Sequence, residues 1–338
     1  MAVPVSSEIK VSNGFLWLFL ILTYLLSWSI WVFSGVLPRG GTGAYDVYWL
    51  VAQIGVFGPA FSALLVSSLI DKKLLQNNLR IFSVLLLPIF LPGLLVVQAS
   101  PSRIIDLSVT PSIVAVAAGV LIVLFFYPVN RYLLSPGTGG RQTRPGSGWV
   151  ILSITLLPGL FLLAWFLANA RGGALEVSAF ESGALSSLWI VLFAFSHNLL
   201  LGGSLGEEIG WRGFLLPALL ERMSPLWASL VLGMMWGVWH LPIDLYAGFG
   251  GEGLEAILAR IVYVLPLSVI FTWFYVHTDG SLLIALFLHT SLNLMGDIGL
   301  SRFQATGMIF FFLIAGTAGV ILVSSSVFRR RAKEMTPP

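Results

Sequence analysis

The chain has 338 residues, of which 57% are hydrophobic and 10% charged, and its formal net charge is +3. A typical soluble domain has a charged share of roughly 25%, so this chain has too little polar surface for a soluble globular protein. The basic residues lie at the ends of apolar segments rather than in a patch with interleaved aromatic residues, which gives no support to nucleic-acid binding. The absence of cysteine excludes disulfides, thiolate metal sites and a cysteine nucleophile.

Apolar runs of about 20 residues recur along the chain, which is the length that a helix needs to cross a bilayer. The runs are continuous rather than alternating with a period of two residues, so helices are favoured over a β-barrel. We therefore predict an all-α, polytopic integral membrane bundle of about ten transmembrane helices. In chain order the predicted spans are 14–37, 47–70, 80–98, 111–134, 149–169, 187–223, 225–242, 256–276, 280–297 and 305–328.

Lysine and arginine are distributed unevenly among the connections between these spans. The second connection, the fourth connection and the C-terminal tail are richer in them than the first, third and fifth connections. By the positive-inside tendency, this distribution predicts that both termini lie in the cytoplasm. We expect a multi-pass protein of the plasma membrane. The residues concerned are Lys72, Lys73 and Arg80, then Arg131, Arg141 and Arg144, then Arg329, Arg330, Arg331 and Lys333, against Arg39, Arg103 and Arg171.

A basic stretch rich in glycine, residues 135–148, divides the chain in two. Its composition predicts a flexible linker. It separates the N-terminal transmembrane helices, within 1–134, from a C-terminal membrane core, 149–338. Nothing in the N-terminal group suggests chemistry.

The stretch 187–223 is too long for a single straight crossing. As one helix it would extend over roughly 55 Å, nearly twice the hydrocarbon thickness of about 30 Å. Gly202, Gly203 and Gly206 mark the expected break, because glycine weakens helices and permits a change of direction. If the two halves were separate crossings, the basic tail would lie outside the cell, so we keep the count of ten spans.

Ionisable side chains inside a bilayer are costly, so each one within a predicted span is a candidate functional residue. Because several occur together in the C-terminal core, we interpret the set as a functional site rather than as packed structural residues. The set consists of Glu207, Glu208 and Arg212 in one span, His240 in the next, and His289 with Asn293 in a third.

The first two of these spans should be neighbours. Glu207 and His240 are nearly equally far along the chain from the expected turn at Ser224-Pro225, so two antiparallel helices would hold them at the same height. Both helices also carry small-residue spacings that allow close packing in membranes, and we expect these spacings to bring the two helices together. The spacings are Gly206-x-x-x-Gly210 and Gly233-x-x-x-Gly237.

Helical geometry gives the two glutamates different roles. Glu208 and Arg212 are four residues apart with the acid on the N-terminal side, which favours an ion pair within the helix. Glu207 points about 100° away around the helix and lacks that partner. Glu207 is therefore the candidate general base.

His289 and Asn293 are also four residues apart and share a helix face. An asparagine amide is a good donor to a developing oxyanion and a poor zinc ligand. Water activated by Glu207 and His240, with the oxyanion held by His289 and Asn293, would make a complete amide hydrolase without a nucleophilic side chain.

Other polar residues receive plainer interpretations. His197 stands alone and is interpreted as a structural residue. His277 lies beside Asp279 at a span end, where an interfacial position is expected. Asp297 continues the face of the third motif at the end of its helix, where it either supports that motif or is exposed at the interface. The glycine-rich loop 246–255 is interpreted as a solvated turn rather than a gate.

The three motifs resemble those of the CPBP family (CAAX protease and bacteriocin-processing, also called Abi), intramembrane proteases related to the type II CAAX prenyl endopeptidases. The family pattern is EExxxR, then FxxxH, then HxxxN or HxxxD. The first and third patterns are intact here, and Trp236 replaces the phenylalanine of the second. The resemblance covers roughly residues 186–300, with the motifs in the family's order.

The resemblance implies an endopeptidase that cuts a membrane-associated protein or peptide, with prenylated C-termini among the candidate substrates. It also implies that Glu207 and His240 activate water. A metal-independent mechanism without cofactors is favoured, and a zinc site of Glu207, His240 and His289 is the alternative. The rival functions are a secondary transporter or channel with buried charges, and a member of the family that binds a membrane partner without cleaving it.

Overall fold

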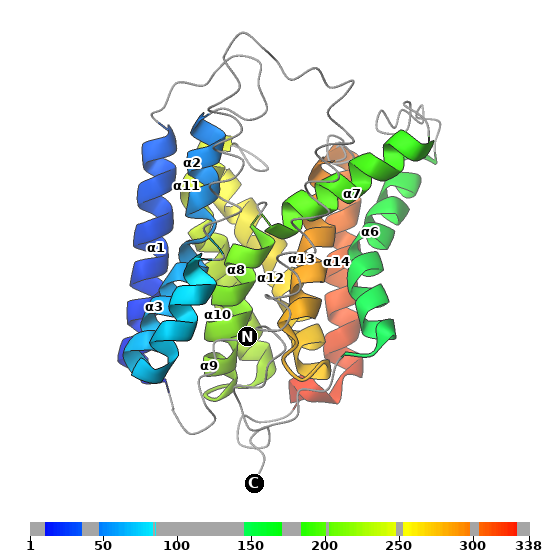
Figure 1. The fold of residues 1–338 in the computed structure, drawn as a ribbon. Coiled ribbons are helices and arrows are strands. Elements are labelled where there is room, and N and C mark those ends of the chain that lie inside the picture. Colours follow the sequence, from blue (N-terminus) through cyan, green and yellow to red (C-terminus); the bar gives the residue numbers. More distant parts are fainter. Residues whose placement is uncertain are drawn as a thin grey trace.

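The computed structural model describes residues 11–35, 47–83, 85, 145–170, 184–200, 203–247, 253–297 and 304–329. Every regular element within these ranges is helical, which confirms the predicted all-α fold (Figure 1). The elements are α1 (Asn13–Gly35), α2 (Val47–Gly55), α3 (Gly58–Ile70), η1 (Lys72–Leu74), α6 (Ser147–Asn169), α7 (Ala184–Leu200), α8 (Ser204–Gly210), η3 (Trp211–Leu215), α9 (Leu216–Leu220), α10 (Pro225–Trp239), α11 (Leu241–Ala247), α12 (Leu254–His277), α13 (Leu282–Asp297), α14 (Gln304–Ser324) and η5 (Ser326–Arg329).

The apolar helices are those of a multi-pass membrane protein. Within the described ranges, five helices are long and apolar enough to cross a bilayer, and two shorter apolar helices accompany them. Of the predicted spans, 111–134 lies outside the described residues, and 80–98 does so beyond residue 85. The five long helices are Asn13–Ser34, Val51–Ile70, Ser147–Asn169, Leu254–His277 and Thr306–Ser324, and the two shorter ones are Pro225–Trp239 and Leu282–Met295.

The predicted break within 187–223 is present. Helix α7 ends at Leu200 and α8 begins at Ser204, after Gly203 with a φ of 101°, a conformation that favours glycine. Figure 1 shows α7 running obliquely toward the centre of the molecule, whereas α8 and α9 run along the direction of α10 and α13. Gly206 is not part of the break, because it lies inside α8.

Proline and glycine define the turns between the central helices. Pro225 occupies the first turn of α10, where its missing N–H costs no hydrogen bond. Helix α12 ends at a turn in which Gly280 has a φ of 77° and donates its N–H to the carbonyl of Tyr275 at 2.8 Å. These tight turns make α9 and α10, and likewise α12 and α13, consecutive antiparallel neighbours.

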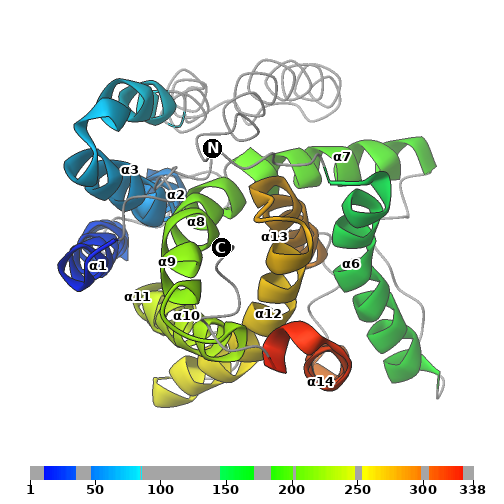
Figure 2. The same cartoon turned by 90° about the horizontal axis from the view of Figure 1, so that it is seen from below.

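Seen from below, the helices with the three motifs occupy the centre of the bundle (Figure 2). Helices α8 to α10 and α12 to α13 form this centre. Helices α1, α2 and α3 pack on one side of it, and α6, α7 and α14 on the other. The described N-terminal helices are therefore in direct contact with the elements of the C-terminal core.

The glycine spacings pack tightly, but not against each other as predicted. A Cβ atom on Gly210 would lie 2.4 Å from Pro59 of α3, and one on Gly206 would lie 2.7 Å from the carbonyl oxygen of Val56. A Cβ on Gly237 would lie 3.0 Å from Ile261 of α12. The expectation that these spacings join α8 to α10 is thus wrong. The glycines of α8 pack against α3 and the residues just before it, and those of α10 pack against α12.

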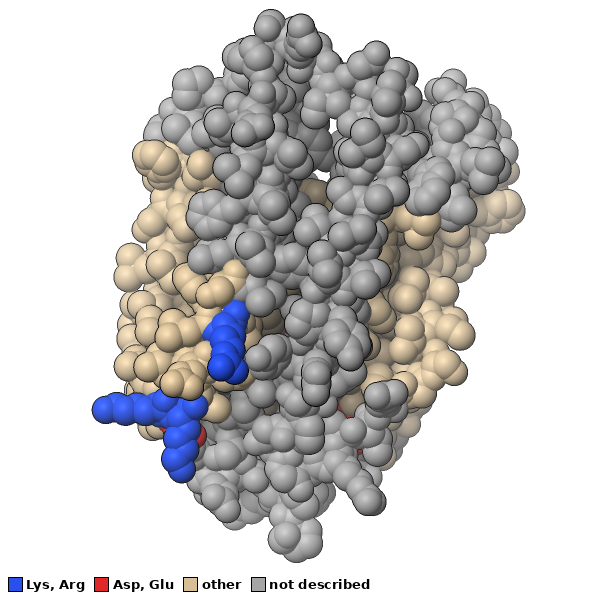
Figure 3. Space-filling view, viewed as in Figure 1, with Lys and Arg blue, Asp and Glu red and all other residues tan. Residues whose placement is uncertain are grey.

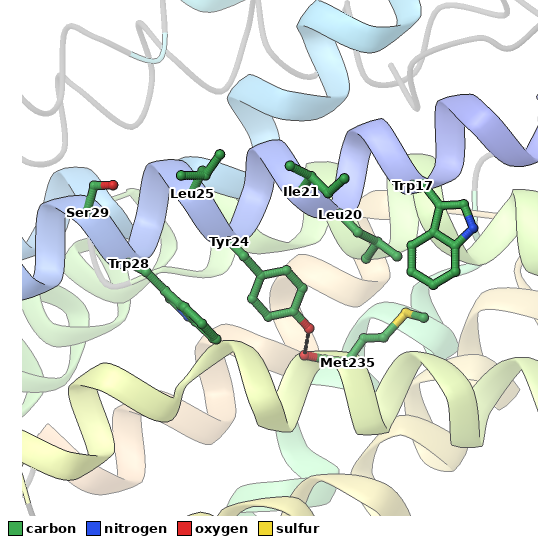
Figure 4. A pocket seen from close by; sticks show the side chains of 8 residues that line it. All are labelled: Trp17, Leu20, Ile21, Tyr24, Leu25, Trp28, Ser29 and Met235. Atoms are coloured by element: carbon green, nitrogen blue, oxygen red, sulfur yellow. Dashed lines mark hydrogen bonds between the residues drawn. The ribbon is translucent and has the colours of Figure 1, made fainter.

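Helix α1 braces α10 through two hydrogen bonds to backbone carbonyls. The Tyr24 hydroxyl donates to the carbonyl of Met235 at 2.8 Å, and the Trp28 indole donates to that of Trp239 at 2.9 Å. Between the helices lies an apolar groove of about 490 Å³, in which the Tyr24 ring points toward the Met235 backbone (Figure 4). The groove is lined by Trp17, Leu20, Ile21, Tyr24, Leu25, Trp28, Ser29 and Met235.

The visible basic side chains gather on one part of the surface. On the face shown in Figure 3, Lys and Arg lie near the lower end of α3, and the described surface above them is uncharged. After helix α3, Asp71 is followed by Lys72 and Lys73 of η1. That this end of α3 is the cytoplasmic one stays a prediction of the positive-inside tendency.

Candidate functional site

The two glutamates lie in the middle of α8, about one helical turn after Gly203. Glu207 is 4% exposed and Glu208 is fully buried. The predicted ion pair is present, since Arg212 Nη1 lies 2.6 Å from Glu208 Oε1. A buried carboxylate without a cationic partner would be very costly in a bilayer, so the pair explains why Glu208 and Arg212 occur together.

Arg212 belongs to a π-helical turn, Trp211–Leu215, between α8 and α9. Such turns are uncommon inside α-helices and recur at functional sites. The guanidinium carbon lies 4.5 Å from the ring centre of Trp236 and 4.1 Å from that of Phe271, so two aromatic faces enclose the cation. Phe271, on α12, carries no polar group and is not distinguishable in the sequence from other apolar residues.

Helix α13 joins the site through a contact that sequence analysis missed. His289 is 3% exposed, and its Nδ1 lies 2.7 Å from Glu208 Oε1. The same oxygen of the Glu208 carboxylate thus forms hydrogen bonds with both Arg212 and His289. Because a buried histidine needs a hydrogen-bond partner, the sequence could have predicted that His289 has one. It could not have identified Glu208 as that partner, because the contact depends on how α8 and α13 pack.

Trp236 connects α10 to the other glutamate. Its indole Nε1 donates to Glu207 Oε2 at 2.6 Å, and both side chains are buried. One helical turn later, His240 bonds through Nδ1 to the Trp236 carbonyl oxygen at 2.8 Å. The carboxylate helix and the first histidine helix therefore meet as expected, through Trp236 rather than through the glycines.

The end of α10 orients His240, which is half-buried. Its backbone N–H bonds to the Gly237 carbonyl at 3.2 Å, which leaves the Trp236 carbonyl for the imidazole. A carbonyl oxygen only accepts hydrogen bonds, so Nδ1 carries the proton and Nε2 of the neutral ring has a free lone pair. That lone pair is suited to accept a hydrogen bond from water.

Three further residues singled out in the sequence are half-buried or exposed in the structure. Asn293 is half-buried one turn after His289 on α13. His197 is half-buried on α7. His277 is exposed at the end of α12 and lies against the rings of Trp149 and Trp273, with centroid distances of 6.0 and 4.7 Å.

Two of the sequence-based interpretations fall wholly or partly outside what the structure describes. Asp297 is the last residue of α13, but its side chain is not among those described. Residues 248–252 of the glycine-rich loop also lie outside the described ranges. The support role suggested for Asp297 and the turn interpretation of the loop stay predictions.

A second ion pair, partly buried, lies beside His240 and was not identified from the sequence. Asp244 of α11 is 1% exposed. Arg260 of α12 donates to it from Nη2 to Oδ1 at 2.6 Å and from Nε to Oδ2 at 2.9 Å. The Asp244 N–H bonds to the His240 carbonyl at 3.0 Å, so the pair secures the segment that follows the histidine. The rule that drew attention to Glu207 also applies to Arg260, which is an ionisable residue inside the predicted span 256–276.

The alternative zinc site would use three side chains from three helices. Nε2 of His240, Nε2 of His289 and the Glu207 carboxylate are chemically suitable donors. In the described part of the chain, however, no three His, Asp or Glu side chains converge closely enough to hold a metal ion. Metal independence stays a prediction, which chelation of the purified protein tests.

Known proteins match the part of the chain that holds the three motifs. The profile of the family described as type II CAAX prenyl endopeptidase Rce1-like matches residues 184–295, which include all three motifs. A protein of Methanococcus maripaludis named CAAX prenyl protease 2 is 30% identical over 185 residues, which are 51% of this chain and 65% of the relative. The chain thus spans slightly less than two thirds of that relative's length. Residues 184–295, which hold the motif residues of α8, α10 and α13, are thus similar to the Rce1-like family of type II CAAX prenyl endopeptidases, in agreement with the resemblance of the motifs.

Proposed function

We propose that this protein is an intramembrane endopeptidase that hydrolyses a peptide bond of a membrane-associated protein or peptide with a glutamate-activated water. The observation that carries the proposal is one buried hydrogen-bonded cluster drawn from three helices. It contains the Glu207–Trp236 bond and the Glu208 carboxylate shared by Arg212 and His289. Groups of this kind are costly in a membrane and have the chemistry of acid–base catalysis.

The charges of the cluster support a division of roles. Glu207 and Glu208 each contribute one negative charge when ionised, and Arg212 contributes one positive charge. A buried cluster is most favourable when it is neutral, which requires one further proton, on either Glu207 or His289. We assign that proton to His289 in the resting state, where Glu208 stabilises the imidazolium. Glu207 is then ionised and able to act as a base.

The reaction begins when Glu207 takes a proton from a water molecule that also donates a hydrogen bond to Nε2 of His240. The water oxygen forms a bond to the carbonyl carbon of the substrate, and the carbonyl oxygen becomes an oxyanion. Nε2–H of His289 and the Asn293 amide donate to this oxyanion. When the C–N bond breaks, the oxyanion reforms the carbonyl group and Glu207 returns its proton to the leaving amine. The products are an amine and a carboxylic acid, which loses its remaining proton to water.

Glu208 and Arg212 act on the groups that contact the substrate. Glu208 accepts from His289 Nδ1 and so directs Nε2 toward the reacting centre. Arg212 compensates the charge of Glu208 and is itself enclosed by Trp236 and Phe271. We propose that no metal ion takes part.

The name of the relative from Methanococcus maripaludis suggests a class of substrate. A CAAX prenyl protease acts on prenylated C-terminal peptides, and we propose such a peptide as the first substrate to test. The test compares membrane proteomes of cells that express the wild-type protein or the Glu207→Gln variant. We expect at least one membrane-associated polypeptide to be shorter only with the wild type. Identical chain termini in the two samples, together with ion or solute flux through the purified protein, would favour a transporter instead.

A further inference from the structure

Trp236 and Glu207 form a direct hydrogen bond between two helices. The indole Nε1 lies 2.6 Å from Glu207 Oε2, with Trp236 2% exposed and Glu207 4% exposed. Trp236 is the sole side-chain donor to this carboxylate among the described residues. A buried bond from N–H to an ionised group is among the stronger hydrogen bonds in proteins.

The other carboxylate oxygen is confined by the backbone. A Cβ atom added to Gly203 would lie 2.6 Å from Glu207 Oε1, so this oxygen occupies the space that a side chain at position 203 would take. The φ of 101° at Gly203 makes glycine the suitable residue there for a second reason. The carboxylate is thus held with Oε2 on Trp236 and Oε1 beside the Gly203 backbone.

Trp236 is itself fixed by its surroundings. Its ring lies over the Arg212 guanidinium and packs edge-on against Phe271 and His289, with centroid distances of 6.0 and 5.6 Å. The His240 ring lies 5.9 Å away. An indole enclosed in this way has little freedom to turn, so it can hold the carboxylate in one orientation.

We infer that Trp236 is the positioning residue for Glu207: its indole N–H occupies Oε2 and leaves Oε1 as the oxygen that takes the proton from water. This inference rests on the proposed function. The related family pattern has phenylalanine at this position, and phenylalanine has no N–H. The hydrogen bond is therefore a property of this chain that the shared motif does not supply.

The test uses Trp236→Phe, which keeps an aromatic ring over Arg212 and removes the N–H. The matched control is Trp211→Phe, because Trp211 is also fully buried and its indole nitrogen has no hydrogen-bond partner within the described structure. We expect Trp236→Phe to lower kcat by about 10- to 100-fold, as a misplacement of about 1 Å can cost roughly 100-fold. KM should stay within about twofold, because the bond does not involve substrate. Trp211→Phe should leave both constants close to the wild type.

Replacement of Trp236 with benzothienylalanine separates the loss of the hydrogen bond from a folding defect. In this analogue sulfur replaces only the N–H group, so the shape of the side chain is kept. The same loss of kcat is expected. Unchanged kcat in this variant, or equal losses in the two phenylalanine variants, would overturn the inference. Glu207→Gln is measured alongside: if it is inactive while the Trp236 variants are fully active, the proposed function stands and the inference alone fails. An active Glu207→Gln would instead refute the proposed base.

Discussion

His289 and Arg212 bind the same oxygen atom of Glu208, at 2.7 and 2.6 Å. Glu208 therefore serves two partners on two helices, although helical spacing indicated only the partner within its own helix. A carboxylate with two such partners cannot be removed without stranding a buried cation and freeing a buried histidine.

This arrangement predicts that Glu208→Gln destabilises the protein. Breaking a buried pair by removing one partner costs roughly 3–5 kcal/mol, and Arg212→Gln should have a similar effect. Thermal unfolding of detergent-purified protein measures this loss. Well-folded, inactive Glu208→Gln together with fully active Glu207→Gln would show that the roles of the two acids are reversed.

The packing of α8 against α3 gives a prediction about small residues. Gly210→Ala would place a methyl group 2.4 Å from Pro59 and 2.6 Å from its carbonyl oxygen, so α8 or α3 must move. We expect a loss of about 1–3 kcal/mol, typical of overpacking. The control is Gly159→Ala in α6, where nothing lies within 4 Å of the added Cβ, and it should be neutral or stabilising. Equal unfolding temperatures for the two variants would contradict the close approach.

Hydropathy was sufficient to place the described membrane helices, because the cost of exposing backbone in lipid requires a helix wherever an apolar run is long enough. The break at Gly203 and the Glu208–Arg212 pair were also predictable, since both depend on local geometry. The bonds from Trp236 to Glu207 and from His289 to Glu208 were not, because they depend on which helices become neighbours. The glycine spacings illustrate this limit: they indicate a close approach, but they do not identify the partner helix.

The uneven distribution of basic residues predicts that both termini are cytoplasmic. Reporter fusions placed after Lys333 and within 137–146 should both report a cytoplasmic location. A tail that reports the outside would mean that 187–223 crosses the bilayer twice and that the count of ten spans is wrong.

Metal independence predicts that a strong chelator leaves the activity of the purified protein unchanged. Elemental analysis should then find far less than one zinc per chain. Activity that is lost on chelation and restored by stoichiometric zinc would refute the metal-free mechanism. In that case Glu207, His240 and His289 would be the first ligands to test by substitution.

The central claim is that Glu207 activates water, and turnover of purified Glu207→Gln tests it most directly. Both proteins are assayed in the same lipid vesicles with a peptide that the wild type cleaves. We expect the variant to lose about 10²- to 10⁴-fold in kcat, the usual contribution of a general base, while its unfolding temperature stays close to that of the wild type. A folded Glu207→Gln protein that cleaves the peptide within tenfold of the wild-type rate would contradict the account.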